Sequence, residues 1–157
     1  MRVSLVLDAS AVVKWFVEED ESSEMRRIRD LYLKGRVVIH IPSLLLIELA
    51  NALRYVKGLT PTDVANAVEA LRALRLNIVD DTEVLEEAIE TAFNTGITVY
   101  DAIYVALAKT TDSKLVTYDA ELLNKFKDIA RKAGQAINEI NTAESLLPNH
   151  TKTTRLK

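Results

Sequence analysis

The sequence predicts an α/β fold built as a three-layer α/β/α sandwich, with a central parallel sheet between two layers of helices. Short apolar runs recur along the chain, and most are followed by a longer stretch with helical spacing. These runs are largely uninterrupted by polar residues, which is typical of strands buried on both faces. Glycine, proline and capping residues mark the boundaries. Strands that alternate with helices in this way form parallel sheets with helices on both faces.

The first half of the chain contains two predicted strands and four predicted helices. The strands cover residues 3–7 and 37–41. The helices cover residues 10–17, 24–33, 43–57 and 60–74. Ser43 is the predicted cap of the third helix. The fourth helix has the strongest start, because the capping Thr60 is followed by Pro61 and then by Asp63.

The second half repeats the pattern with weaker strands. Strands are predicted at residues 77–79 and 114–117, with a weak last strand within 136–140. Helices are predicted at residues 81–96, 100–109 and 119–132. Residues 1–147 form one predicted domain. The last ten residues, 148–157, carry lysine and arginine without an acid, and we expect a mobile basic tail there.

The composition is that of an ordinary folded protein. Of the 157 residues, 48% are apolar and 27% are charged. No apolar run reaches the length of a membrane span, and the first residues lack the features of a signal peptide. Because the chain has no cysteine, disulfides, thiolate metal sites and a cysteine nucleophile are excluded. We therefore expect a cytoplasmic protein without a membrane segment. The net charge of −3 gives no overall attraction to nucleic acid, although a local basic face would suffice.

Four carboxylates stand beside apolar segments, where an unpartnered acid is costly. Several converging acids are costlier still, since like charges repel, and a divalent cation removes both penalties. Asp8 and Asp119 each follow a predicted strand. Because ligands of parallel sheets bind beyond the carboxyl ends of the strands, these two acids predict a site at that edge of the sheet. The four acids are Asp8, Glu48, Asp101 and Asp119.

Each acid also has a structural interpretation. Asp8 could equally cap the helix that follows it, with Ser10 as a competing cap, and a capping role is the commoner one for Asp119. Asp101 heads a helix and lies above a buried stripe. Glu48 is harder to explain by structure alone, because its neighbours at helical spacing are apolar. The alternative is that Glu48 reaches water from the edge of that face. Asp80 and Asp81 are interpreted as helix caps.

Other chemistries find little support. The four glycines are isolated, so there is no glycine-rich phosphate cradle. The two histidines do not predict a zinc site or a catalytic triad, because His40 is in the middle of a predicted strand and His150 is in the tail. An aspartyl-phosphate enzyme usually needs a second aspartate where this chain has Ser10. A receiver-domain role for Asp8 leaves Glu48 and Asp101 unexplained.

Four segments in order carry a family resemblance. They are Val6-Leu7-Asp8-Ala9-Ser10, Ile47-Glu48-Leu49-Ala50-Asn51, Tyr100-Asp101-Ala102-Ile103-Tyr104 and Leu115-Val116-Thr117-Tyr118-Asp119. Together they resemble the PIN-domain nucleases, and within them the VapC-type toxins of prokaryotic toxin–antitoxin pairs. The resemblance covers residues 3–147, though the last strand and the tail match poorly.

This resemblance implies a sheet ordered 3-2-1-4-5, a homodimer, and cleavage of RNA that depends on Mg²⁺ or Mn²⁺. It implies that Asp8, Asp101, Asp119 and Glu48 hold the metal and that Thr117 and Ser10 give polar support. Oxygen ligands of this kind suit hard cations. It also implies a small antitoxin partner. Candidate contacts to RNA phosphates are Lys14, Arg54, Lys57 and Lys109, each of which could instead be a solvated helix residue.

Two other functions remain open at the level of sequence. One is a housekeeping RNA-processing nuclease of the same fold that has no antitoxin. The other is a non-catalytic interaction module with a degenerate acidic pocket, against which the presence of all four acids argues. A small reading frame immediately upstream in the genome would favour the toxin.

Overall fold

The protein has a five-stranded parallel sheet in the order β3-β2-β1-β4-β5. The computed structural model describes residues 2–147, so the predicted tail at 148–157 lies outside the described residues. The strands are β1 (Val3–Leu7), β2 (Val37–Pro42), β3 (Asn77–Val79), β4 (Lys114–Val116) and β5 (Ala130–Arg131). Both the fold class and the strand order predicted from the sequence are confirmed.

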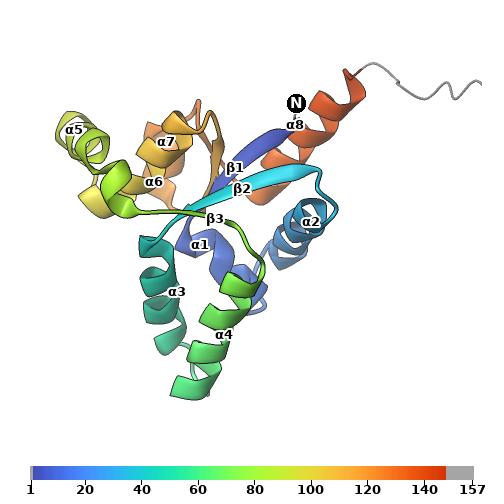
Figure 1. Cartoon of the computed structure of the whole chain (residues 1–157), viewed down its shortest axis with the longest axis vertical. Helices are drawn as coiled ribbons and strands as arrows, with labels where there is room; N and C mark the ends of the chain where they lie inside the picture. The colour runs from blue at the N-terminus through green and yellow to red at the C-terminus, as the bar shows by residue number, and fades with distance from the viewer. Residues whose placement is uncertain (1, 148–157) are drawn as a thin grey trace, which may run out of the picture.

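Helices cover both faces of this sheet. They are α1 (Ala9–Val12), α2 (Ser22–Leu33), α3 (Leu44–Arg54), α4 (Pro61–Ala73), α5 (Leu85–Thr95), α6 (Val99–Thr110), α7 (Ala120–Lys125) and α8 (Ala133–Ser145), with short 3₁₀ turns η1 (Val13–Trp15) and η2 (Asp81–Glu83). Figure 1 shows α5, α6 and α7 on one side of the sheet and α1, α2 and the α3–α4 pair on the other. Helix α6 contacts β1, β2 and β4, and α5 packs against α6.

The core lies between the sheet and these helices. Leu5, Val6 and Leu7 are almost fully buried, as the uninterrupted apolar run predicts. Seven consecutive residues of α6, from Ala102 to Ala108, are buried as well. A helix buried on all sides fixes the position of Asp101, the half-buried residue just before this run. Within residues 2–147, no helix has the length and apolar character needed to cross a membrane.

The last part of the chain differs from the prediction. The helix predicted at 119–132 ends at Lys125, and the fifth strand is the two-residue β5 rather than part of 136–140. That segment belongs to α8, where Ala136 and Ile140 are buried one helical turn apart. A two-residue strand is too short to show any periodicity. The strand β5 is defined only by its pairing with β4. The backbone N–H of Leu115 donates to the carbonyl of Ile129, and the backbone N–H of Thr117 donates to the carbonyl of Arg131.

The start of α3 also differs from the prediction. Ser43 makes no side-chain capping bond to α3. Instead Asp81, from the turn after β3, accepts a hydrogen bond from the backbone N–H of Leu44 at 2.8 Å. In return Ser43 Oγ accepts from the backbone N–H of Asp81 at 3.2 Å. The helix is thus capped by a residue distant in sequence, and the prediction that Asp81 has a structural role is borne out.

Candidate active site at the carboxyl edge of the sheet

The site is built around the ends of the two central strands. Asp8 follows β1, Thr117 follows β4, and the backbone N–H of Asp8 donates to the carbonyl of Val116 at 3.3 Å. The chain runs from β1 outward to β3 on one side and returns to β4 on the other. The β1–β4 junction is therefore the point where strand order reverses, which is where open α/β sheets bind their ligands.

Asp8 is held by three donors although it is buried. Its Oδ1 accepts from Ser10 Oγ at 2.6 Å and from the backbone N–H of Ala11 at 3.1 Å. Its Oδ2 accepts from the hydroxyl of Thr117, which has no solvent exposure. The bond from Ala11 caps α1, so Asp8 has the structural role that the sequence allowed and also faces the site. Burial raises the pKa of Asp8 to about 6, and the charge of Asp101 contributes to the rise.

The two hydroxyl groups also tie the strand ends together. Ser10 Oγ accepts from the backbone N–H of Tyr118 at 2.8 Å, and Thr117 Oγ1 accepts from that of Asp119 at 3.1 Å. Each hydroxyl therefore donates to Asp8 and accepts from the segment after β4. Such secondary contacts orient a ligating carboxylate.

Glu48 comes to the same edge from α3. It is half-buried, at the border between the core-facing side of α3 and a pocket. Its Oε1 accepts from the hydroxyl of Tyr104 on α6 at 2.7 Å. Burial raises the pKa of Glu48, the bond from Tyr104 lowers it, and the charges of Asp101 and Asp8 raise it further. Glu48 thus neither enters the core unpartnered nor turns fully to water.

Asp101 is the acid that neighbours all three others. Burial raises its pKa and the charge of Asp119 raises it further, while the charge of Asp101 in turn raises the pKa of Asp8 and of Glu48. Asp119 is half-exposed and caps α7, accepting from the backbone N–H of Leu122 at 2.9 Å. The structure thus gathers all six residues predicted for the site at one edge of the sheet.

The acids do not form a closed ligand cluster. In the part of the chain that the structure describes, no three His, Asp or Glu side chains are close enough together to hold one metal ion. Repulsion between like charges opposes a closer approach.

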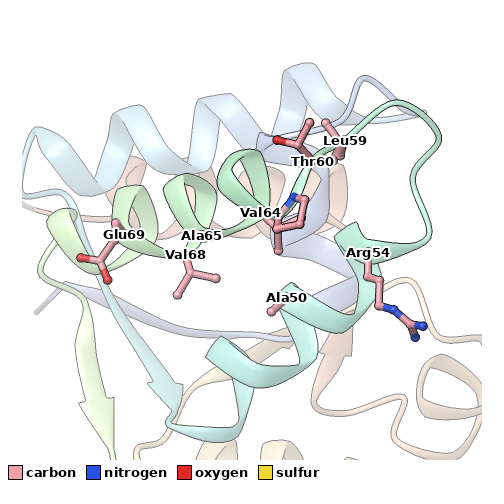
Figure 2. Close-up of a pocket in the computed structure, with 9 residues that line it drawn as sticks. Ala50, Arg54, Leu59, Thr60, Val64, Ala65, Val68 and Glu69 are labelled. Carbon is pink, nitrogen blue, oxygen red and sulfur yellow. The ribbon is translucent and has the colours of Figure 1, made fainter.

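A pocket of about 380 Å³ opens beside Glu48, lined by Ala9, Leu44, Ile47, Glu48, Asn51, Ala52 and Tyr100. A larger pocket of about 610 Å³ lies between α3 and α4, on the face of α3 that carries Ala50 and Arg54 (Figure 2). None of the four acids lines this second pocket. Helical spacing explains the separation, because the residues facing α4 and those beside Glu48 are on different sides of α3. We refer to the pocket beside Glu48 as the Glu48 pocket.

One of the four predicted RNA contacts is wrong in this structure. Lys14 is buried, lies over the Tyr118 ring at 4.2 Å and forms an ion pair with Glu19 at 3.6 Å. Its charge is already partnered, so it is not available to a phosphate. Arg54, Lys57 and Lys109 are exposed, and their contact with RNA stays a prediction.

Comparison with known proteins agrees with the geometry. Residues 5–132 match the family model described as the PIN domain. The chain belongs to the PIN-domain family. It is 37% identical over 131 residues to Ribonuclease VapC3 of Pyrobaculum aerophilum, an alignment that covers 79% of this chain and 95% of the relative.

Solved structures share the PIN-domain fold. The crystal structure of PAE2754 from Pyrobaculum aerophilum has a TM-score of 0.65 and 26% identity, and the match covers 90% of this chain and 99% of that one. VapBC2 from Rickettsia felis, bound to a DNA fragment from its promoter, has a TM-score of 0.60 and 18% identity, with 83% and 98% covered. At that identity the second match shows the fold alone.

The donor set of this PIN domain fits a divalent metal ion. Asp8, Glu48, Asp101 and Asp119 supply only oxygen, the ligand type preferred by Mg²⁺ and Mn²⁺. Asp8 has the surroundings of a ligand carboxylate, since two hydroxyl groups and one backbone N–H orient it. Three of the four acids also have raised pKa values, with causes that include the charge of another acid of the group, and a cation would offset that repulsion.

Two residues of the site were not predicted from the sequence. Tyr104 belongs to the buried stripe of α6 below Asp101, and nothing in the sequence shows that its hydroxyl meets Glu48, 56 positions away. Asp81 was assigned a cap, but of its own helix and not of α3. The available signal was weak: a tyrosine within a run of apolar helix residues needs a hydrogen-bond partner when buried.

Proposed function

We propose that this PIN-domain protein is a ribonuclease that needs Mg²⁺ or Mn²⁺, cleaves RNA internally and is the toxin of a toxin–antitoxin pair. The observation that supports it best is the buried carboxylate of Asp8, which two hydroxyl groups and one backbone N–H orient at the point where strand order reverses. Asp8 and Asp119 also cap helices, but capping does not require that Glu48 and Asp101 come to the same edge of the sheet. The similarity to Ribonuclease VapC3 supports the same activity.

In the proposed mechanism the residues divide the work. Asp8 and Asp101 would be the principal ligands of the ion, with Asp119 completing the site directly or through water. An ion held by these carboxylates would supply Lewis acidity for activating water and for neutralising charge on the phosphate. Glu48 would orient the attacking water, since one of its oxygens is fixed by Tyr104. Ser10 and Thr117 hold Asp8 in place.

The antitoxin and the homodimer are further parts of the proposal. The resemblance to VapC-type toxins is the basis for proposing a small protein partner that blocks the acidic edge, and the structure from Rickettsia felis, which shares the fold, carries the name VapBC2. A housekeeping nuclease would share the acids but lack this partner. Co-expression with the product of any small reading frame found immediately upstream separates the two. A toxin is expected to co-purify with that product and to be inhibited by it, whereas a housekeeping nuclease is expected to do neither.

Cleavage of a labelled single-stranded RNA tests the activity itself. We expect cleavage with Mg²⁺ or Mn²⁺ that stops with EDTA, and linearisation of a circular RNA, which requires internal cleavage. Asp101→Asn should abolish cleavage, whereas Glu90→Gln, at an exposed acid of α5, should leave it unchanged. Cleavage that continues in excess EDTA would contradict the metal mechanism, and full activity of Asp101→Asn would contradict the site. Absence of cleavage by the wild-type protein would leave a non-catalytic module as the better explanation.

A further inference from the structure

The Glu48 pocket combines features that the proposed chemistry does not use. The acids and their hydroxyl partners account for the cleavage edge, but the pocket continues past Glu48 over Ile47, Asn51 and Tyr100. Its volume of about 380 Å³ is within the range of about 300–1,000 Å³ typical of small-molecule sites. Because Glu48 lines this pocket and is also a candidate catalytic residue, the pocket adjoins the proposed cleavage site.

Two large side chains of this pocket expose aromatic or apolar surface to water, which is unfavourable unless a ligand covers it. Tyr100 is 65% exposed and Ile47 is 70% exposed, and each lies between two half-buried helix positions. Tyr100 directly precedes Asp101, and Ile47 directly precedes Glu48. Each candidate catalytic acid on the helices therefore has a large exposed apolar or aromatic neighbour beside it. Both residues line the pocket, Tyr100 from α6 and Ile47 from α3.

Asn51 supplies the polar group of the pocket. It lies one helical turn after Ile47 and Glu48 and is exposed. Its amide offers both a donor and an acceptor. An exposed aromatic ring, an aliphatic wall and one amide are the combination with which proteins bind unstacked bases of single-stranded RNA.

We propose that the Glu48 pocket binds one unpaired nucleobase next to the phosphate that is cleaved, stacked on Tyr100 and hydrogen-bonded by Asn51. The inference rests on the proposed ribonuclease function and adds the substrate class: RNA whose base at this position is unstacked, as in a loop or a single strand. Base-paired RNA keeps its bases in the stack and does not fill the pocket. Tyr100 is then a specificity-determining residue.

Fluorescence of a base analogue measures this binding directly. A short single-stranded RNA carries 2-aminopurine at successive positions around the cleaved bond, and Asp8→Asn protein is used so that the probe stays intact. We expect quenching at one position, where the base stacks on a ring. Adding Tyr100→Ala should remove the quenching and weaken binding about tenfold or more, whereas Tyr100→Phe should retain both.

Tyr55 provides a matched control. It is 73% exposed and ends α3, but it does not line the Glu48 pocket. Tyr55→Ala should bind and quench as the parent does. With cleaving protein, Tyr100→Ala should raise KM for single-stranded RNA with little change in kcat, and Asn51→Ala should alter which base is preferred. Equal effects of the Tyr55 and Tyr100 changes would overturn the base site.

The two proposals fail in different ways. If wild-type protein cleaves RNA and Tyr100→Ala leaves KM and quenching unchanged, the base site is wrong and the nuclease stands. If RNA binds with quenching that depends on Tyr100 but is never cleaved, the nuclease is wrong and the site stands. If Tyr100→Ala instead changes the sedimentation mass and leaves RNA binding intact, the face is a contact between protein chains and the base site is overturned. Absence of any RNA binding overturns both.

Discussion

The two walls of the candidate site are built differently. The strand wall, formed by Asp8, Ser10, Thr117 and Asp119, lies at the ends of β1 and β4. The helix wall is formed by Glu48 on α3 and Asp101 on α6. In the strand wall the carboxylate of Asp8 is buried and receives three hydrogen bonds. In the helix wall Glu48 is half-buried and receives one side-chain hydrogen bond, from Tyr104.

This difference separates two tasks. A carboxylate with every hydrogen bond made inside the protein keeps one orientation and suits a permanent ligand. A half-exposed carboxylate can face water and substrate. Asp8 in the strand wall therefore fits the metal, with Asp101 reaching the same ion from the helix wall, and Glu48 fits the attacking water and the RNA that change during the reaction. Five changes test this division, from the largest expected effect to the smallest.

Asp8→Asn should have the largest effect on activity. Replacing a ligand should cost more than the roughly 10- to 100-fold typical of residues that only orient a ligand. The fold should survive, because asparagine also caps a helix and removes a buried charge. Cleavage rate and thermal melting measured on the same preparation decide this. Near-wild-type cleavage would show that Asp8 is a cap only.

Glu48→Gln should lose most activity while stability stays near that of the wild type or rises, since a neutral isostere costs less to bury. If Glu48 binds metal, Mg²⁺ should raise the melting temperature of the wild type more than that of this variant. If the strand wall alone binds the metal, the two shifts are equal while activity is still lost. Unchanged activity would remove Glu48 from the site.

Tyr104→Phe should reduce kcat about tenfold, with KM for RNA unchanged, because it removes only the donor that orients Glu48. Packing of the buried ring is retained. In the Glu48→Gln background the same change should add little, since the two residues act through one contact. A full effect of Tyr104→Phe in that background would mean that the hydroxyl acts elsewhere.

Stability without metal should depend on pH through Asp8. Its folded-state pKa of about 6 is above the ordinary value of 3.8, so the native state binds the proton more tightly. The free energy of unfolding should therefore fall as pH rises from about 4 to about 6, by on the order of 3 kcal/mol. Denaturant titrations in EDTA, compared with Asp8→Asn, isolate this contribution. An identical pH dependence in the two proteins would contradict the buried charge.

Asp81→Ala should have the smallest effect, a loss of roughly 1 kcal/mol in the free energy of unfolding, as for other N-caps. Its acceptor for the backbone N–H of Leu44 disappears, and kcat should fall only slightly because α3 carries Glu48 in its second turn. Asp80→Ala, which removes the cap of η2 alone, is the control. Equal losses of kcat in both variants would mean that capping of α3 does not position Glu48.

The sequence by itself determined the elements with strong local signals. Burial sets the apolar run of β1, hydrogen bonding sets the capping box at Thr60, and a positive φ sets the helix end at Gly96. Each of these effects acts over only a few residues. The same patterns placed Asp8 and Asp119 after strands, which in a parallel sheet implies one shared edge. The last strand was missed because β5 exists only through pairing with β4.

The tertiary structure decided which side chains meet. Tyr104 reaches Glu48 across 56 positions, Asp81 caps α3 from 37 positions away, and Lys14 is buried under Tyr118 instead of reaching solvent. These contacts depend on how α3, α6 and the loops pack, and packing leaves no periodic trace in the sequence. Residue type and local pattern thus indicated the chemistry of the acids, whereas only the fold determined how each acid is held.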